Sequence, residues 1–272
     1  MYLMSKTKLN LVGDSFTHLT HGNKGYSVHG KEAKTVEWVF DDNNGISFYV
    51  DRSMTQAFSD NVKGIKYGWL LESKYVTPDI VNDVKRDYKE YLEVFRYIFT
   101  HNKELLDLDE RFKWCPPNGT WIKDPQVYPK TKMLSFITSN KNSTPGHKLR
   151  LKWVDMIGDQ VDLFGRGFNE IPLKEEGLCD YMFSVAIENG FYDSYHTEKI
   201  LDCFATGTIP VYMGSPSISE YFNAEGIIEL TEEFEVSEEI YYDKMDAIED
   251  NLERVKKIGV LEDFILENYD IV

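Results

Sequence analysis

Residues 183–214 read FSVAIENGFYDSYHTEKILDCFATGTIPVYMG, two apolar runs separated by a polar segment and a helical pattern. The runs at 183–187 and 209–213 have the length and continuous apolarity of strands buried on both faces of a parallel sheet. Between them, Thr197 is a candidate N-cap, an apolar stripe follows and a glycine ends the predicted helix. Because ligands of such sheets bind beyond the carboxyl ends of the strands, we expect a ligand site at residues 188–199.

The same alternation of strand and helix continues on both sides of this unit. Further strands are expected at 8–12, 35–40, 46–50, 65–71, 133–138, 161–164 and 227–230, and further helices at 79–100, 147–157, 237–258 and 261–268. An irregular, proline-containing stretch at 115–128 is the expected domain boundary. The pattern predicts an α/β protein with open-sheet domains at 1–128 and 129–258, and a terminal helix at 259–272 that packs back on the first domain.

Charge is unevenly distributed along the 272 residues, whose formal net charge is −16. From Glu170 onward the chain has 6 Lys/Arg and 25 Asp/Glu, which argues against nucleic acid or an anionic membrane as a partner. Lys199 is the only Lys or Arg between Lys174 and Lys244. A cation in the first turn of a helix is placed unfavourably by the helix dipole, so its presence there favours a bound anion.

No apolar run approaches the ~20 residues needed to cross a bilayer, and the first ten residues lack the apolar core of a signal peptide. The three cysteines lack metal-ligand spacing and are expected to be reduced, buried side chains. These observations predict a cytoplasmic protein without stable membrane insertion.

The segment 188–199, ENGFYDSYHTEK, followed by a helix and TIPVYMGSPS, resembles the signature of the family 10 glycosyltransferases, the α1,3/4-fucosyltransferases. The resemblance extends upstream over 132–167 through KMLSFITSN, Arg150 on a predicted helix and VDLFGRG. It covers roughly 100 residues. It implies a GT-B fold, in which two Rossmann-like open-sheet domains face a cleft: 129–258 binds the nucleotide sugar, and 1–128 lies on the acceptor side.

The resemblance also assigns donor-binding residues. Arg150 and Lys199 fall on positions that contact the diphosphate, and a guanidinium fork with a point charge at a helix start suits that anion. The other expected donor-binding residues are Glu188, Asn189, Tyr195 and Glu198. Their side chains suit hydroxyl or nucleotide recognition, although a turn at 188–189 and a favourable first-turn acid at 198 explain them without a ligand.

A catalytic base is expected in the first domain. The predicted strand YGWLL ends in Glu72-Ser73, which is similar to the strand-then-Glu-Ser segment that bears the proposed base in fucosyltransferases. Glu72 is therefore the candidate base for deprotonating the acceptor hydroxyl. The sequence departs from the family pattern at Ile187 and at His196, and we expect His196 to be an exposed loop residue.

The resemblance implies an inverting, metal-independent glycosyltransferase that moves L-fucose from GDP-fucose to a hydroxyl of a glycan. The expected partners are thus a nucleotide sugar and a glycan or glycoconjugate acceptor. No cofactor is expected to be essential, since the GDP-sugar is a substrate. A different nucleotide-sugar donor, or an inactive protein that only binds nucleotide sugar or glycan, remains open.

Two other motifs suggest different chemistry. Asp107-Leu-Asp109 has the spacing of a metal-binding Asp pair, but it lies in a charged helix end or turn and arises easily by chance. Val12-Gly13-Asp14-Ser15 looks like the nucleophile block of a GDSL-type esterase. That chemistry needs a histidine near the carboxyl end, and no histidine follows His196.

Overall fold

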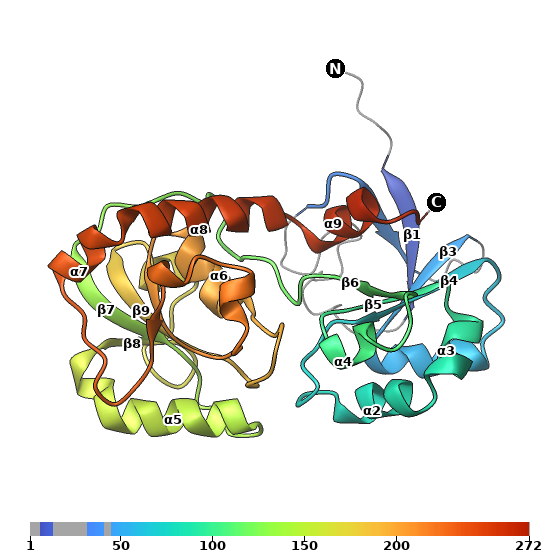
Figure 1. Ribbon diagram of the computed structural model, residues 1–272, viewed down its shortest axis with the longest axis horizontal. Coiled ribbons are helices and arrows are strands. Elements are labelled where there is room, and N and C mark those ends of the chain that lie inside the picture. The colour runs from blue at the N-terminus through green and yellow to red at the C-terminus, as the bar shows by residue number, and fades with distance from the viewer. Residues whose placement is uncertain (1–5, 13–31, 41–44, 272) are drawn as a thin grey trace, which may run out of the picture. The chain divides into compact units, whose positions relative to one another are not determined.

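The computed structural model describes residues 6–12, 32–40 and 45–271 (Figure 1). The chain divides into two compact units, one made of Met1–Gly119 with Ile258–Val272 and the other of Thr120–Lys257. Each unit contains one open sheet whose neighbouring strands are all parallel. The expected α/β class with two open parallel sheets is confirmed.

The sheet of the first unit has the strand order β2-β1-β3-β4-β5-β6. Its strands are β1 (Thr7–Val12), β2 (Val36–Val39), β3 (Ile46–Val50), β4 (Ile65–Leu70), β5 (Tyr97–Thr100) and β6 (Phe112–Trp114). Both faces are covered, as a parallel sheet requires. Along β3, Phe48 and Val50 enter the core on one face, whereas Tyr49 between them enters the core on the other.

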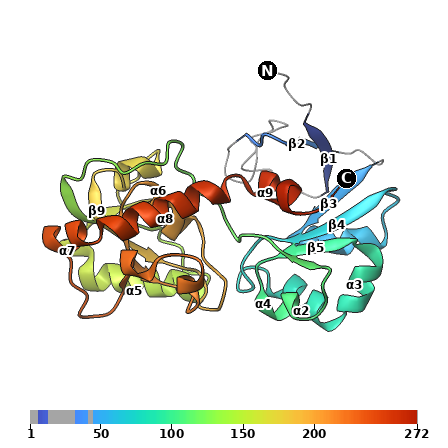
Figure 2. The same cartoon turned by 45° about the horizontal axis from the view of Figure 1, so that its top comes forward.

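Helices lie on both faces of this sheet (Figures 1 and 2). α2 (Pro78–Arg86) and α3 (Tyr88–Val94) cover the Tyr49 face, and the short α4 (Lys103–Leu106) adds Leu105 to the same core. The opposite face receives α9 (Leu261–Asn268), which contributes Leu261 and Ile265.

Polar contacts also hold α9 on the first unit. The buried Asp263 carboxylate accepts hydrogen bonds from the backbone of Lys34 and from both the backbone and the hydroxyl of Thr35, at 2.6–2.9 Å. Trp38 Nε1 donates to Glu262 at 3.1 Å. Chain segments more than 220 residues apart in sequence are thus joined beside β2.

The single helix predicted at 79–100 is wrong. The chain forms α2, then α3 after an interruption at Asp87, and then the strand β5. β5 pairs with β4 and β6, and its Ile98 and Phe99 side chains are fully buried. An apolar run with an aromatic and a β-branched residue is more stable as a central strand than as the end of an amphipathic helix.

The sheet of the second unit has the strand order β11-β10-β9-β7-β8. Its strands are β7 (Lys132–Ile137), β8 (Asp162–Phe164), β9 (Tyr181–Ile187), β10 (Ile209–Met213) and β11 (Ile228–Glu229). All seven residues of β9 are buried, which explains the continuous apolar run in the sequence. The helices are α5 (Pro145–Ile157), α6 (Glu198–Ala205), α7 (Glu238–Asp243) and α8 (Met245–Ile258).

The expected extent of the first domain, 1–128, differs from the observed unit, whose first segment ends at Gly119. The next residues are held by α6 and the turn that follows it. Asp202 accepts from the Thr120 hydroxyl and the Trp121 backbone, and Gln126 donates its backbone N–H to Ala205 O. Residues 120–128 therefore pack with the second unit. Among the described residues, no helix combines the length and the apolarity needed to cross a bilayer.

Candidate functional site

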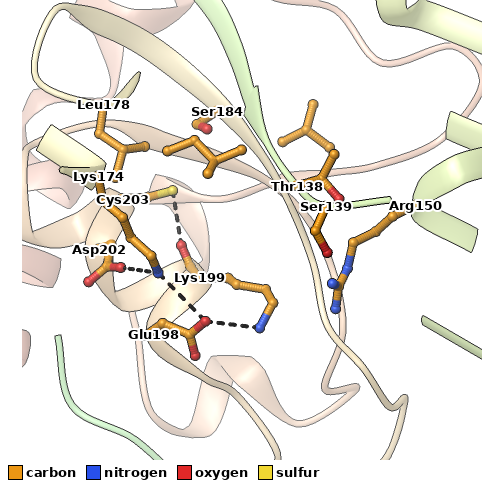
Figure 3. Close-up of a pocket in the computed structure, with 12 residues that line it drawn as sticks. Thr138, Ser139, Arg150, Lys174, Leu178, Ser184, Glu198, Lys199, Asp202 and Cys203 are labelled. Atoms are coloured by element: carbon orange, nitrogen blue, oxygen red, sulfur yellow. Dashed lines mark hydrogen bonds and ion pairs between the residues drawn. The ribbon is translucent and has the colours of Figure 1, made fainter. Parts of the chain in front are cut away.

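A pocket of about 180 Å³ opens in the second unit beside the start of α6 (Figure 3). Its walls come from the segment after β7, from α5, from the 3-10 turn η3 (Lys174–Gly177), from β9 and from α6. The polar and charged side chains that line it include Ser139, Arg150, Lys174, Glu198, Lys199 and Asp202. Five of the twelve lining residues are charged, so the pocket suits a charged ligand.

One wall of the pocket is fixed by the close approach of α5 to the end of β9. Thr144 caps α5 in a capping box with His147, and a Cβ at Gly146 would lie only 2.1 Å from Glu188 O. Only glycine therefore fits where the helix passes the strand end. This contact places Arg150 against residues 187–189.

Arg150 lies in the second turn of α5, which starts two residues earlier than predicted. The side chain is buried; Nε donates to Ile187 O at 2.9 Å, and a second guanidinium nitrogen donates to the Asn189 side chain. Burial lowers the pKa of Arg150, although the Glu188 carboxylate opposes this shift. Arg150 is thus an anchored cation rather than a solvated one.

Glu188 determines where α6 begins. The side chain is fully buried, and its two oxygens accept from the backbone N–H and the hydroxyl of Thr197, both at 2.7 Å. Thr197 in turn caps the helix by accepting from Lys199 N. In this structure Glu188 is an internal acceptor that orients the helix start, and its expected part in donor binding stays a prediction.

An alternating row of charges crosses the pocket (Figure 3). Lys199 Nζ lies 3.6 Å from Glu188 and 3.2 Å from Glu198 Oε1. The same Glu198 oxygen lies 3.6 Å from Lys174 Nζ, which contacts Asp202 Oδ2 at 2.7 Å. Each carboxylate of the row thus lies beside a lysine, which offsets the cost of removing these charges from water.

Lys174 and Asp202 were not among the residues expected at the site. Asp202 is 1% exposed and also accepts hydrogen bonds from Thr120 and Trp121, whereas Lys174 reaches the pocket from η3, 24 residues before Glu198. Burial alone would lower the pKa of Lys174, but the Asp202 and Glu198 carboxylates outweigh it and raise this pKa. Lys174 therefore stays an ammonium. The feature of the sequence that could have pointed to Lys174 is that it is one of only six Lys or Arg residues after Glu170, in a part of the chain with many acidic residues.

The arrangement suits a polyanion. Figure 3 shows the Lys199 ammonium and the Arg150 guanidinium directed toward the same part of the pocket, with Ser139 beside them. The start of α6 adds the positive end of a helix dipole. Two of the six cations after Glu170, Lys174 and Lys199, lie in this pocket. The structure therefore brings the predicted Arg150 and Lys199 together with an unpredicted third cation.

Asn189 and Tyr195 lie beside the pocket wall rather than in it. Asn189 contacts Arg150, whereas the buried Tyr195 ring stacks on Tyr192 with centroids 4.8 Å apart. The loop is held further by Ser194, whose backbone adopts a left-handed φ of 67° and whose N–H donates to Ser217. The expected contact of Tyr195 with a nucleotide stays a prediction.

The expectation that His196 is an exposed loop residue is wrong. His196 is 1% exposed and packs against the rings of Tyr221 and Phe222, with centroids 5.0 and 5.3 Å away. Its Nδ1 has no hydrogen-bond partner among the described residues. Burial lowers the pKa of His196 to about 3, so the imidazole is neutral at physiological pH.

Glu72 lies in the first unit, two residues after β4 ends at Leu70, and is exposed. The backbone N–H groups of Leu71 and Glu72 donate to Asp51 Oδ1 at 3.0 and 3.2 Å. The backbone at Glu72 is thus held by the side chain of Asp51, which directly follows the neighbouring strand β3.

The two alternative motifs have different outcomes. Asp107 pairs with Lys103, and Asp109 pairs with Arg111, so both carboxylates have cationic partners. No group of three or more metal-ligating side chains occurs within residues 6–12, 32–40 and 45–271. The Gly13-Asp14-Ser15 motif lies outside the described residues.

Comparison with known proteins relates the second unit to one family. Residues 127–255 match the family described as glycosyltransferase family 10 (fucosyltransferase) C-term. An alpha-(1,3)-fucosyltransferase of Helicobacter pylori is 31% identical over 140 residues, which are 49% of this chain and 28% of that protein. A 4-galactosyl-N-acetylglucosaminide 3-alpha-L-fucosyltransferase of Cricetulus griseus is 30% identical over 104 residues, 36% of this chain and 28% of that one. The matched part thus spans less than a third of these relatives.

The likeness in structure extends over the whole chain. The crystal structure of an alpha1,3-fucosyltransferase with GDP aligns with a TM-score of 0.52 at 18% identity, covering 100% of this chain and 94% of that one. This likeness shows that the two chains share the GT-B fold.

The pKa of His196 predicts a pH-dependent stability. The pKa of His196 in the folded protein, about 3, lies below the ordinary 6.5. The stability that neutral His196 contributes to the folded state is therefore complete above pH 6.5 and is lost as the pH falls toward 3. The difference in free energy of unfolding between wild type and His196→Phe should therefore be about 2 kcal/mol smaller at about pH 5 than at about pH 8. Urea unfolding measures it.

Tyr221→Phe is the control, because it alters a neighbouring ring without adding or removing a group that titrates in this range. Its difference from wild type should stay constant between the two pH values. A constant difference for His196→Phe as well would contradict the low pKa.

Proposed function

Because residues 127–255 match the family described as glycosyltransferase family 10 (fucosyltransferase) C-term, we propose that this protein is an inverting fucosyltransferase. It transfers L-fucose from GDP-fucose to a hydroxyl of a glycan, and no metal ion is essential. The observation that supports this most is the convergence of Arg150, Lys174 and Lys199 on one pocket of a strongly acidic unit, beside a helix start.

The proposed donor chemistry follows from these cations. When the bond between the sugar and the diphosphate breaks, negative charge grows on the diphosphate. Arg150 supplies a planar fork and Lys199 a point charge for its oxygens. These groups are already held in place by Ile187 O and by Thr197, so little reorganisation is needed. GDP as the nucleotide is supported by its presence in the similarly folded alpha1,3-fucosyltransferase.

Glu198 is proposed to recognise the sugar or ribose hydroxyls. A carboxylate is an acceptor only, and Glu198 is the partly exposed carboxylate of the pocket, whereas Glu188 and Asp202 are buried. Lysines lie on both sides of it, with Lys199 Nζ at 3.2 Å and Lys174 Nζ at 3.6 Å from Glu198 Oε1. Glu188 and Asn189 act by orienting the start of α6 and Arg150.

Glu72 is proposed as the base. Inversion requires that the acceptor oxygen attack the anomeric carbon opposite the leaving diphosphate and lose its proton as the new bond forms. An exposed carboxylate after a buried strand can accept that proton. For the acceptor, the relatives support a galactosyl-N-acetylglucosaminide, which is the substrate that several of their names give.

The first prediction concerns GDP. Replacing Lys199 by Met removes one charge-assisted contact and should weaken GDP binding by about 10- to 100-fold. Thermal shift at increasing GDP concentration measures it, since a ligand of the folded state raises stability by mass action. Arg150→Lys should also weaken binding because it keeps the charge but loses the fork.

Lys148→Met is the matched control. Lys148 is an exposed cation of the same α5 helix, and its loss should change GDP affinity by no more than about 2-fold. Unchanged GDP affinity in both site variants would remove the phosphate assignment. If the wild type bound another nucleoside diphosphate more tightly than GDP, the proposed donor, GDP-fucose, would be wrong.

The second prediction concerns the base. Glu72→Gln keeps the size of the side chain but cannot accept the proton, so kcat for transfer should fall by about 10²- to 10⁴-fold. GDP affinity should match wild type. The measurement is GDP release from GDP-fucose with 3- and 4-galactosyl-N-acetylglucosaminides as acceptors, and a fully active variant would exclude Glu72 as the base.

The third prediction concerns metal. Fixed cations stabilise the leaving diphosphate in this proposal, so transfer should survive EDTA with less than about a 2-fold loss of rate. Loss of activity in EDTA with recovery on addition of Mn²⁺ would show that a divalent ion takes part. Asp107→Asn and Asp109→Asn would then test whether the Asp pair holds it.

A further inference from the structure

Asp51 is a buried carboxylate that directly follows β3, one of the two central strands of the first unit's sheet. β3 ends at Val50, and Asp51 starts the 3-10 helix η1 (Asp51–Phe58). The residue is 6% exposed, and its φ of 48° lies in the left-handed region that few non-glycine residues occupy. This backbone conformation fixes the position of the side chain relative to the end of the neighbouring strand β4.

The Asp51 carboxylate is bound to the backbone that bears Glu72. Its Oδ1 accepts from the N–H groups of Leu71 and Glu72, at 3.0 and 3.2 Å. These are the first two residues after β4. One side-chain oxygen thus satisfies both donors and determines how the chain leaves the sheet at Glu72.

An ionisable group is costly at this position. Burial, together with the negative charge of Glu72, raises the pKa of Asp51 to about 7, although the N–H groups of residues 71 and 72 and the Arg52 charge act in the opposite direction. Arg52 is itself exposed and bound to Asp79. An asparagine could accept the same two hydrogen bonds, tolerates a left-handed φ and carries no charge into the interior. A buried carboxylate with a raised pKa at the carboxyl end of a strand is a candidate for a functional role.

We propose that Asp51 is a positioning residue for the base, fixing the backbone of Glu72 and strengthening Glu72 as a proton acceptor through its negative charge. This inference rests on the proposed function of Glu72. A like charge nearby makes it harder for Glu72 to remain ionised, so its proton affinity is higher. Asp51 itself does not contact the reacting atoms.

The proton balance of the step is simple. The acceptor hydroxyl oxygen forms a bond to the anomeric carbon as the bond from that carbon to the diphosphate oxygen breaks, and GDP leaves with the electron pair. The hydroxyl proton passes to Glu72. With Asp51 ionised, the protonated form of Glu72 is favoured, which lowers the barrier of the step.

The test compares the pH dependence of kcat for wild type, Asp51→Asn and Glu90→Gln, with GDP-fucose and a 4-galactosyl-N-acetylglucosaminide. Asp51→Asn should lower kcat by about 3- to 10-fold at about pH 7.5, with the KM for donor within about 2-fold of wild type. The acid limb of the profile should move to lower pH and become less steep, because one of two coupled ionisations is removed. Glu90→Gln, an exposed carboxylate-to-amide change on α3, should leave the profile unchanged.

Stability provides a second measurement that does not depend on turnover. The pKa of Asp51 in the folded protein lies above the ordinary 3.8. The stability that protonated Asp51 contributes to the folded state is therefore complete below pH 3.8 and is lost as the pH rises through about 7. The melting temperature of Asp51→Asn relative to wild type should therefore rise between about pH 5.5 and about pH 8. Glu72→Gln removes the negative charge that helps to raise the pKa of Asp51. In this variant the loss of stability should therefore occur at lower pH, since coupling between two sites is reciprocal.

The outcomes separate the two proposals. An active wild type with superimposable profiles for wild type and Asp51→Asn would overturn the role of Asp51. A wild type that releases no GDP from GDP-fucose, with either a 3- or a 4-galactosyl-N-acetylglucosaminide as acceptor, would overturn the proposed function instead. Melting temperatures of Asp51→Asn and wild type that differ by a constant amount across this pH range would show that Asp51 does not titrate there, which also overturns the inference.

Discussion

The rest of the candidate site depends on the hydrogen bonds that the buried Glu188 carboxylate accepts from Thr197. The carboxylate binds the backbone and the hydroxyl of Thr197, and so fixes where α6 begins and which residues form its first turn. Glu198 and Lys199 occupy that turn, and Arg150 is held against the same strand end through Ile187 O. A charged, buried acceptor at the end of β9 therefore defines the position of both expected phosphate-binding cations. Since Glu188 lies at the carboxyl end of a central strand, the site is part of the framework of the sheet rather than of a separate loop.

Much of this arrangement could be predicted from the sequence, because its signals are local. The apolar runs at 183–187 and 209–213, Thr197 and the glycine that ends α6 lie within one stretch of 32 residues. The isolation of Lys199 among acidic residues indicated an anion site, and its helix start is where the structure forms the pocket. Local patterning fails where a run is compatible with two structures. Residues 97–100 continue the helical periodicity of 79–94, and only pairing with β4 and β6 makes them a strand.

The residues that sequence reasoning missed are defined by long-range contacts. Asp202 joins Lys174, 28 residues away, to Thr120, 82 residues away, and no spacing rule connects these positions. The same contacts explain why residues 120–128 pack with the second unit. His196 illustrates the opposite case, since its polarity suggested exposure but the rings of Tyr221 and Phe222 enclose it. Asp51 could not be recognised from the sequence either, because its proposed role depends on hydrogen bonds from the backbone of Leu71 and Glu72, about 20 residues later in the chain.

The alternating row of charges has a consequence for selectivity among anions. Each lysine of the row lies beside a carboxylate, so the pocket supplies its own counter-ions. A small free anion such as inorganic phosphate would have to compete with these internal partners while gaining few new contacts. A larger ligand that also offers hydroxyl groups to Glu198 can satisfy the displaced carboxylate and the lysines together. The row thus favours a large ligand that carries both phosphate and hydroxyl groups over a small anion such as inorganic phosphate.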